Sequence, residues 1–126
     1  MRLQRRVLLL VTLLGGIGPL AGPSLAGVSA VEQARIDRLL EFVELRKDVK
    51  FVRNGSEYSC EDAAKFMRGK MKAMGEHVSS AQQFIDQIAA KSSTTGQPYM
   101  IRFADGRTMP SAQFLADELK RMDGKN

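Results

Sequence analysis

The sequence contains one cysteine, one histidine and no tryptophan. Its single cysteine, Cys60, cannot form a disulfide within the chain, so packing must hold any domain together. One cysteine and one histidine are too few for an ordinary zinc site, and no carboxylates stand at a spacing that would complete one. We therefore predict no metal and no cofactor.

The short motifs of common catalytic sites are also missing. No nucleophile-elbow sequence is present, although serine, histidine and aspartate all occur. Cys60 and His77 bracket an expected helix that would hold them roughly 20 Å apart. The polar loop at residues 92–98 follows the C-terminal end of a helix, where the dipole disfavours an anion, and leads into a strand. These absences predict that the protein is not an enzyme.

The first 26 residues have the three-part pattern of an export signal. Residues 1–6 include three arginines, residues 7–14 are an unbroken apolar run, and small residues follow. Glycines and a proline interrupt the apolar stretch short of the roughly 20 residues that a membrane span needs, so we expect no permanent membrane anchor. We predict a signal peptide cleaved after Ala26, with cleavage after Ala30 as the alternative.

Removing this segment changes the charge of the chain. Three of the 19 basic residues and none of the 14 acidic residues lie in it, which leaves 16 basic against 14 acidic, a net charge of +2. Such a small charge gives no dense basic face, so nucleic acid is not expected as a partner. The remaining residues 27–126 are enough for one domain with a single core.

Helical periodicity predicts four helices in that domain. They cover residues 31–47, residues 60–74, a segment capped by Ser79 or Ser80, and residues 110–122. The first and third helices each place several apolar residues on one face, with charged or polar residues on the others. Each helix therefore has a face that can bury against a common core.

The second helix carries a methionine-rich stripe, in which we expect burial of Cys60, Ala64, Met67, Met71 and Met74. With His77, the cysteine and methionines could form a soft-metal site, but methionine is an ordinary core residue at this spacing. Gly69 lies inside the helix at a cost of about 1 kcal/mol relative to alanine, which suggests a close approach by a neighbouring helix.

Two hairpins complete the predicted fold. The turns are Asn54-Gly55, after alternating residues 48–53, and Asp105-Gly106, after alternating residues 99–103. A two-residue turn at Asn54-Gly55 places Arg53 opposite Ser56, Val52 opposite Glu57 and Phe51 opposite Tyr58. Both aromatic rings then lie on one face of the hairpin, where we expect them in the core.

The order helix, hairpin, helix, helix, hairpin, helix predicts a small single α+β domain. The two hairpin-helix units are alike, which suggests an internal duplication, although any hairpin followed by a capped helix would look similar. We expect a core that includes Ile36, Leu40, Phe51, Tyr58, Met67, Met71, Phe84, Ile88, Ile101, Phe103 and Leu115.

Three segments also carry a resemblance to a known family. They are ARIDRLLEFVELRKDVKFVRNGSEYSCEDAAKFMRGKM, AQQFIDQIA and GQPYMIRF. In these segments the chain resembles the YfeK-like family of small exported bacterial proteins, a family of unknown function, over residues 32–103. The resemblance implies a soluble periplasmic protein of a Gram-negative bacterium, processed after Ala26. It implies no catalytic residues.

The candidate site residues are three arginines and the cysteine. Arg53, Arg102 and Arg107 lie in or beside the hairpins and could jointly hold a carboxylate or a polyanion; separately, each would be a solvated edge residue. Cys60 begins a helix, whose dipole favours a thiolate, but the adjoining acidic residues and the apolar stripe oppose one. We predict a buried neutral thiol, with an intermolecular disulfide or a redox role as alternatives.

Together these features predict a soluble periplasmic protein that acts as a non-catalytic binding or interaction module. Its expected partner is another periplasmic protein or an anionic ligand, because a compact core without a reactive cluster still offers helix faces and hairpin edges. The alternative is a thiol-dependent function, redox or disulfide-linked, through Cys60.

Overall fold

The computed structural model describes residues 28–124, so the expected signal peptide and its cleavage site at Ala26 lie outside the described residues. The elements in chain order are α2 (Ala30–Glu44), β1 (Val49–Arg53), β2 (Ser56–Ser59), α3 (Cys60–Met74), α4 (Ala81–Phe84) with a π-helical turn (Ile85–Ala89), β3 (Met100–Phe103), β4 (Thr108–Pro110) and α5 (Ser111–Gly124). This order confirms the predicted small α+β domain with two hairpins.

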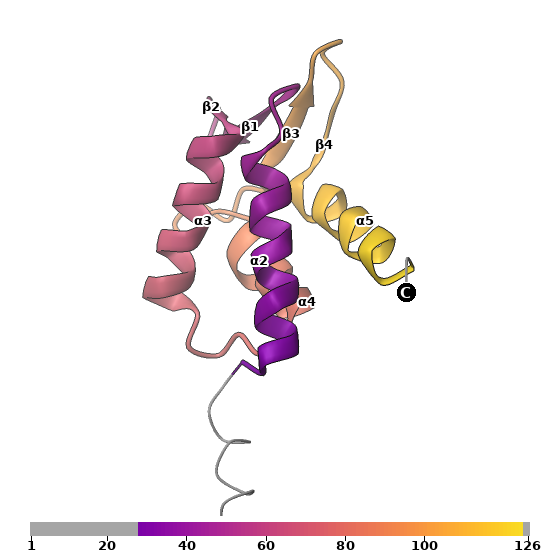
Figure 1. The fold of residues 1–126 in the computed structure, drawn as a ribbon. Coiled ribbons are helices and arrows are strands. Elements are labelled where there is room, and N and C mark those ends of the chain that lie inside the picture. The colour runs from indigo at the N-terminus through magenta and orange to yellow at the C-terminus, as the bar shows by residue number, and fades with distance from the viewer. Residues whose placement is uncertain (1–27, 125–126) are drawn as a thin grey trace, which may run out of the picture.

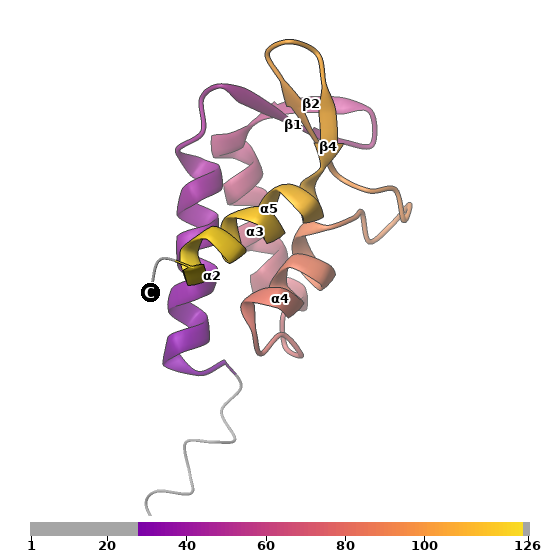
Figure 2. The same cartoon turned by 90° about the vertical axis from the view of Figure 1, so that its right-hand side faces the viewer.

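The two hairpins join into one antiparallel sheet with the strand order β2-β1-β3-β4. In Figure 1 the strands lie above the helices, and α2 runs beside α3. Figure 2, turned by 90°, shows α5 leaving the end of β4 and crossing in front of α2 and α3. The helices therefore gather on one side of the sheet and enclose the core between the two layers.

The first hairpin has the predicted register, with Phe51 opposite Tyr58 and Arg53 opposite Ser56. Asn54 and Gly55 at its turn have φ angles of 49° and 85°, the left-handed conformation that this pair of residues tolerates. Phe51 is fully buried on the helix-facing side, and Tyr58 packs against the core while remaining partly exposed. Both rings lie on one face, as predicted.

The centre of the sheet is the pairing of β1 with β3, in which Phe51 lies opposite Ile101 and Lys50 opposite Arg102. Because side chains alternate along a strand, Phe51 and Ile101 face the helices while Lys50 and Arg102 face solvent. The same alternation turns Arg53, two residues after Phe51, toward the helices.

Several element boundaries differ from the prediction. The first helix ends at Glu44, not residue 47, and Arg46 instead makes two hydrogen bonds to Asp48, of 2.8 and 2.7 Å, ahead of β1. The third helix starts after Ser80 but continues as a π-helical turn. The last helix extends past residue 122 to Gly124, and Asp123 in its last turn pairs with Arg35 of α2 at 2.6 Å.

Most of the predicted core is confirmed. Eight of the expected side chains are buried: Ile36, Leu40, Phe51, Met67, Phe84, Ile88, Ile101 and Leu115. Tyr58, Met71 and Phe103 pack against this core but are only partly buried. Met74 was expected in the buried stripe of α3, and this expectation is wrong: the side chain is 50% exposed, because it lies in the last turn of the helix, beside a cleft.

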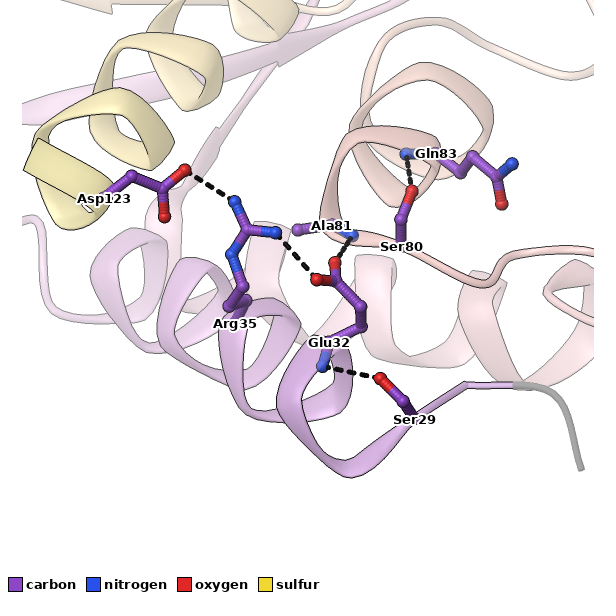
Figure 3. A network of polar contacts seen from close by, with 7 residues as sticks. All are labelled: Ser29, Glu32, Arg35, Ser80, Ala81, Gln83 and Asp123. Carbon is purple, nitrogen blue, oxygen red and sulfur yellow. Dashed lines mark hydrogen bonds and ion pairs between the residues drawn. The ribbon is translucent and has the colours of Figure 1, made fainter. Parts of the chain in front are cut away.

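A polar network joins α2, α4 and α5 at a distance from the sheet (Figure 3). The Glu32 carboxylate accepts a 2.8 Å hydrogen bond from the Ala81 backbone N–H at the start of α4, and another of 2.8 Å from Arg35. Arg35 also donates to Asp123 of α5 at 2.6 Å. Glu32 thus satisfies an N–H group at a helix end, where a negative charge is favoured.

Met67→Ala should lower the free energy of unfolding by roughly 2 to 5 kcal/mol, the usual cost of a cavity at a methionine that is 0% exposed. Met74→Ala makes the same chemical change at a half-exposed position of the same helix and should cost less than about 0.5 kcal/mol. Urea unfolding of both variants measures the difference. A loss below about 1 kcal/mol for Met67→Ala would contradict its place in the core.

Glu32 is expected to make the free energy of unfolding depend on pH in the acid range. The Ala81 N–H, and after it Arg35, lower the pKa of Glu32 below its ordinary 4.5. A lowered pKa in the folded state contributes stability that is complete above pH 4.5 and is lost as the pH falls through the lowered pKa.

Glu32→Gln should therefore destabilise the protein by about 1 kcal/mol at pH 7, and the difference from the wild type should shrink as the pH falls below 4.5. Thermal unfolding between pH 7 and pH 3 measures it, with the exposed Glu41 of the same helix changed to Gln as the control. A penalty that stayed constant down to pH 3 would show that the Glu32 charge does not contribute.

Candidate functional site

A cleft of about 450 Å³ opens between α3, the end of β1 and the loop at residues 90–99. Helix α3 contributes Phe66, Gly69, Lys70 and Met74, which share one flank because they are three or four residues apart. Strand β1 contributes Arg53, and the loop contributes Tyr99. The cleft therefore depends on three segments that are distant in sequence.

Arg53 is held in the cleft by aromatic rings. Its guanidinium carbon lies 4.4 Å from the centroid of the Phe66 ring and 5.5 Å from that of Tyr58, within the range of cation–π attraction. Its Nε atom is buried and has no hydrogen-bond partner among residues 28–124. No carboxylate in the same part of the chain lies within 4.0 Å of the guanidinium.

Lys70 is the second cation of the cleft and is only 8% exposed. Its Nζ donates to the backbone oxygen of Lys91 at 2.8 Å and to the Tyr99 hydroxyl at 3.1 Å. An ammonium group has three N–H bonds, so one is left without a partner in the described part of the chain. Burial, and after it the charge of Arg53, lowers the pKa of Lys70.

Tyr99 connects the two cations to the core. It is fully buried, its ring lies 5.1 Å from that of Phe51 and 5.8 Å from that of Phe66, and burial raises the pKa of its hydroxyl. Its backbone accepts from Ser111 N at 2.8 Å, at the start of α5. Tyr99 is thus a rigid floor for the cleft.

The rim of the cleft is a hydrogen-bonded turn. The Ser92 hydroxyl accepts from the backbone N–H groups of Thr94 and Thr95, both at 3.3 Å. Thr95 donates to the side-chain oxygen of Asn54 at 2.7 Å, which ties this loop to the β1–β2 turn. The serines and threonines at residues 92–95 therefore order the loop, and Ser93 and Thr94 also line the cleft.

Gly69 has a different environment from the one expected. We expected a neighbouring helix to approach it closely, but a Cβ atom built at this position would meet nothing within 4 Å. Gly69 instead lines the open cleft. The helix cost of this glycine, about 1 kcal/mol, is therefore not offset by helix packing.

The structure does not bring the three candidate arginines together. Arg53 lies in the cleft, whereas Arg102 lies on the opposite face of the sheet and pairs with Glu57 at 2.6 Å. Arg107 lies in the second hairpin, paired with Asp105 at 2.7 Å and stacked on the Phe103 ring. Of the three, only Arg53 is without a carboxylate partner among the described residues.

Lys70 was not among the candidate residues predicted from the sequence. The available signal was its position: Lys70 falls three residues after Met67, on the buried flank of α3, whereas Lys65, Arg68 and Lys72 fall on the exposed side. A lysine on the apolar side of a predicted helix needs a polar partner, and here the Lys91 carbonyl supplies it.

Cys60 lies in the core, 1% exposed, with its thiol 3.7 Å from the Val49 backbone oxygen. Burial raises the pKa of this thiol, which favours the neutral form. His77 lies beyond the other end of α3, exposed beside Glu76. Among residues 28–124, no three histidine, cysteine, aspartate or glutamate side chains are grouped so that they could hold a metal ion. No helix in the same residues combines the length and hydropathy of a membrane span.

Comparison with known proteins identifies the family. Residues 30–123 match a family of unknown function, DUF5329. The chain belongs to this family. It is 43% identical, over 77 residues, to the "Uncharacterized protein YfeK" of Salmonella typhimurium strain LT2, a match that covers 61% of this chain and 64% of that relative. No solved structure matches. The resemblance to YfeK-like proteins is confirmed.

A buried Cys60 predicts slow reaction with a thiol reagent in the native protein and rapid reaction after denaturation. A colorimetric thiol assay with and without guanidinium measures the ratio, which should exceed about tenfold, because reaction requires opening of the core. A non-reducing gel should show a monomer. Rapid native labelling, or a dimer band that disappears on reduction, would support the thiol-dependent alternative instead.

Proposed function

We propose that this protein is an exported, non-catalytic binding protein that holds a small anion in the cleft between α3, β1 and the loop at residues 90–99. One observation carries the proposal. Two cationic side chains, Arg53 and Lys70, share this cleft, and neither has a carboxylate partner among the described residues.

The unpaired charges favour a negatively charged ligand. Charges removed from water without an opposite charge are costly, and two like charges in one cleft add to that cost. The lowered pKa of Lys70 reflects both effects. A bound anion would reduce the repulsion and satisfy donors that have no acceptor in the described chain.

The shape and donors of the cleft fit a small ligand. Its volume of about 450 Å³ falls within the range of ligand pockets, roughly 300 to 1,000 Å³. A guanidinium group can donate two parallel hydrogen bonds to a carboxylate or phosphate, and Lys70 has one N–H left for the same group. Stacking on Phe66 and Tyr58 holds the Arg53 head in place before a ligand arrives.

The side chains that line the cleft support binding rather than catalysis. None of them is a carboxylate, a histidine or a cysteine, so the serine and threonine hydroxyls of the lining have none of these groups beside them as a general base. Lys70, the other candidate base, already donates hydrogen bonds to the Lys91 backbone oxygen and the Tyr99 hydroxyl. Cys60 is separate from the cleft, in the core, so its position does not favour a thiol-dependent function.

Export to the periplasm is also part of the proposal. It is supported by the charged, apolar and small-residue pattern of residues 1–26. Cleavage after Ala26 would leave Ser29 in place, and its hydroxyl accepts a 3.2 Å hydrogen bond from Glu32 N at the start of α2. Cleavage after Ala30 would remove this cap.

Arg53→Gln should weaken anion binding by at least about tenfold, because it removes the bidentate, charged donor of the site. Titration of the ¹⁵N-labelled mature protein with inorganic phosphate and with acetate, followed by NMR, measures affinity and location together. We expect shifts at residues 53, 69, 70 and 92–94. Arg102→Gln removes the same charge from the opposite face of the sheet and should leave the affinity within about twofold.

Two results would contradict the proposal. The first is the absence of saturable shifts around the cleft with either anion. The second is an equal loss of affinity in Arg53→Gln and Arg102→Gln, which would indicate attraction by net charge instead of a site. Thermal unfolding of both variants establishes that each is folded at the titration temperature.

A further inference from the structure

Gly69 is an anomaly on the flank of α3. Glycine is a poor residue for the inside of a helix, and no neighbouring atom within 4 Å requires its small size. The position nevertheless lines the cleft that contains Arg53 and Lys70. The space that a side chain would fill is therefore open space within the candidate site.

The surroundings of this space are largely apolar. Phe66 lies one helical turn before Gly69, the half-exposed Met74 lies just over one turn after it, and the Tyr99 ring forms the floor. Gly69 and Lys70 both line this cleft, so its charged end and the open apolar space are parts of one site. A ligand that filled both would carry a charge and an apolar group close together.

We propose that Gly69 makes room for an apolar group of the bound anion, so that the ligand is an amphipathic organic anion and not an inorganic ion. This inference rests on the proposed function. The anionic head of the ligand binds Arg53 and the free N–H of Lys70, and its apolar group packs on the α3 backbone at Gly69, between Phe66 and Met74. Gly69 then determines specificity by setting the size of the group that fits.

The mechanism follows from the area that each part of the ligand can bury. An inorganic ion uses the two cations and leaves the apolar walls exposed to water. An alkyl or aromatic substituent removes Phe66, Met74 and itself from water, which is favourable in proportion to the apolar area buried. A side chain at position 69 would occupy the same space and compete with the substituent, while leaving the cations accessible.

Acetate and hexanoate test this inference, because they share a carboxylate and differ in the length of the alkyl chain. The mature wild-type protein should bind hexanoate at least about tenfold more tightly than acetate. Gly69→Leu should lower the hexanoate affinity to about that of acetate and leave the acetate affinity within about twofold. Lys72→Leu adds the same side chain on the exposed side of α3 and should preserve the preference for hexanoate.

Gly69→Ala is a second test, which does not require that the fold accept a leucine side chain at position 69. Alanine is a better helix residue and meets no atom, so this variant should raise the thermal midpoint. It should also weaken hexanoate binding severalfold, in the direction of Gly69→Leu, because a methyl group enters the cleft.

The outcomes separate this inference from the proposed function. If acetate and hexanoate bind wild type equally, or if the position-69 variants keep the preference for hexanoate, the role of Gly69 is wrong and the anion site stands. If acetate, hexanoate and phosphate all leave the cleft resonances of the wild-type protein unshifted, the proposed function fails and the inference fails with it.

Discussion

The antiparallel pairing of β1 with β3 is the constraint on which the rest of the fold depends. It joins two local hairpins into one sheet and places Phe51 opposite Ile101 at its centre. Each hairpin leads directly into a helix, so this single pairing brings α3 and α5 to the same face. It also places the end of β1, with Arg53, near the start of β3, where Tyr99 enters the core. Without that pairing there would be a pair of hairpin-helix units and no cleft.

The local parts of this structure could be predicted because their causes are local. Positive φ angles at Asn54 and Gly55 fix the register of the first hairpin within a few residues. Ser59 accepts a hydrogen bond from Asp62 N and so starts α3 where the sequence predicted. The β1–β3 pairing joins residues about fifty positions apart in the sequence, and no turn residue indicates it. Each hairpin could therefore be predicted from the sequence, but the pairing between the two hairpins could not.

The same difference between local and long-range interactions explains which residues of the candidate site could be predicted. Arg53 could be chosen from its place at the end of a strand. Arg102 and Arg107 could not be separated from it, because the partner of Arg102 comes from β2, on the far side of β1, and that of Arg107 from the local turn. The helical periodicity predicted that Met74 is buried, because the spacing of apolar residues does not indicate at which turn of the helix the contacts with the core end. Lys70 can be buried on α3 because the Lys91 carbonyl accepts its hydrogen bond. This acceptor is twenty-one residues away in the sequence, so the pattern of α3 alone does not indicate it.

Three locally unfavourable features share the flank of α3 that faces the cleft. Gly69 weakens the helix without allowing closer packing, Lys70 places a charge where it is 8% exposed, and Met74 leaves an apolar side chain half in water. Any one of these features on its own would not indicate a functional site in a small domain. Natural sequences are otherwise locally consistent with their folds, and departures from this consistency concentrate at functional sites. All three residues line the same cleft. An amphipathic anion would contact each of them, with its apolar group at the open backbone of Gly69 and the exposed thioether of Met74 and its charge at Lys70.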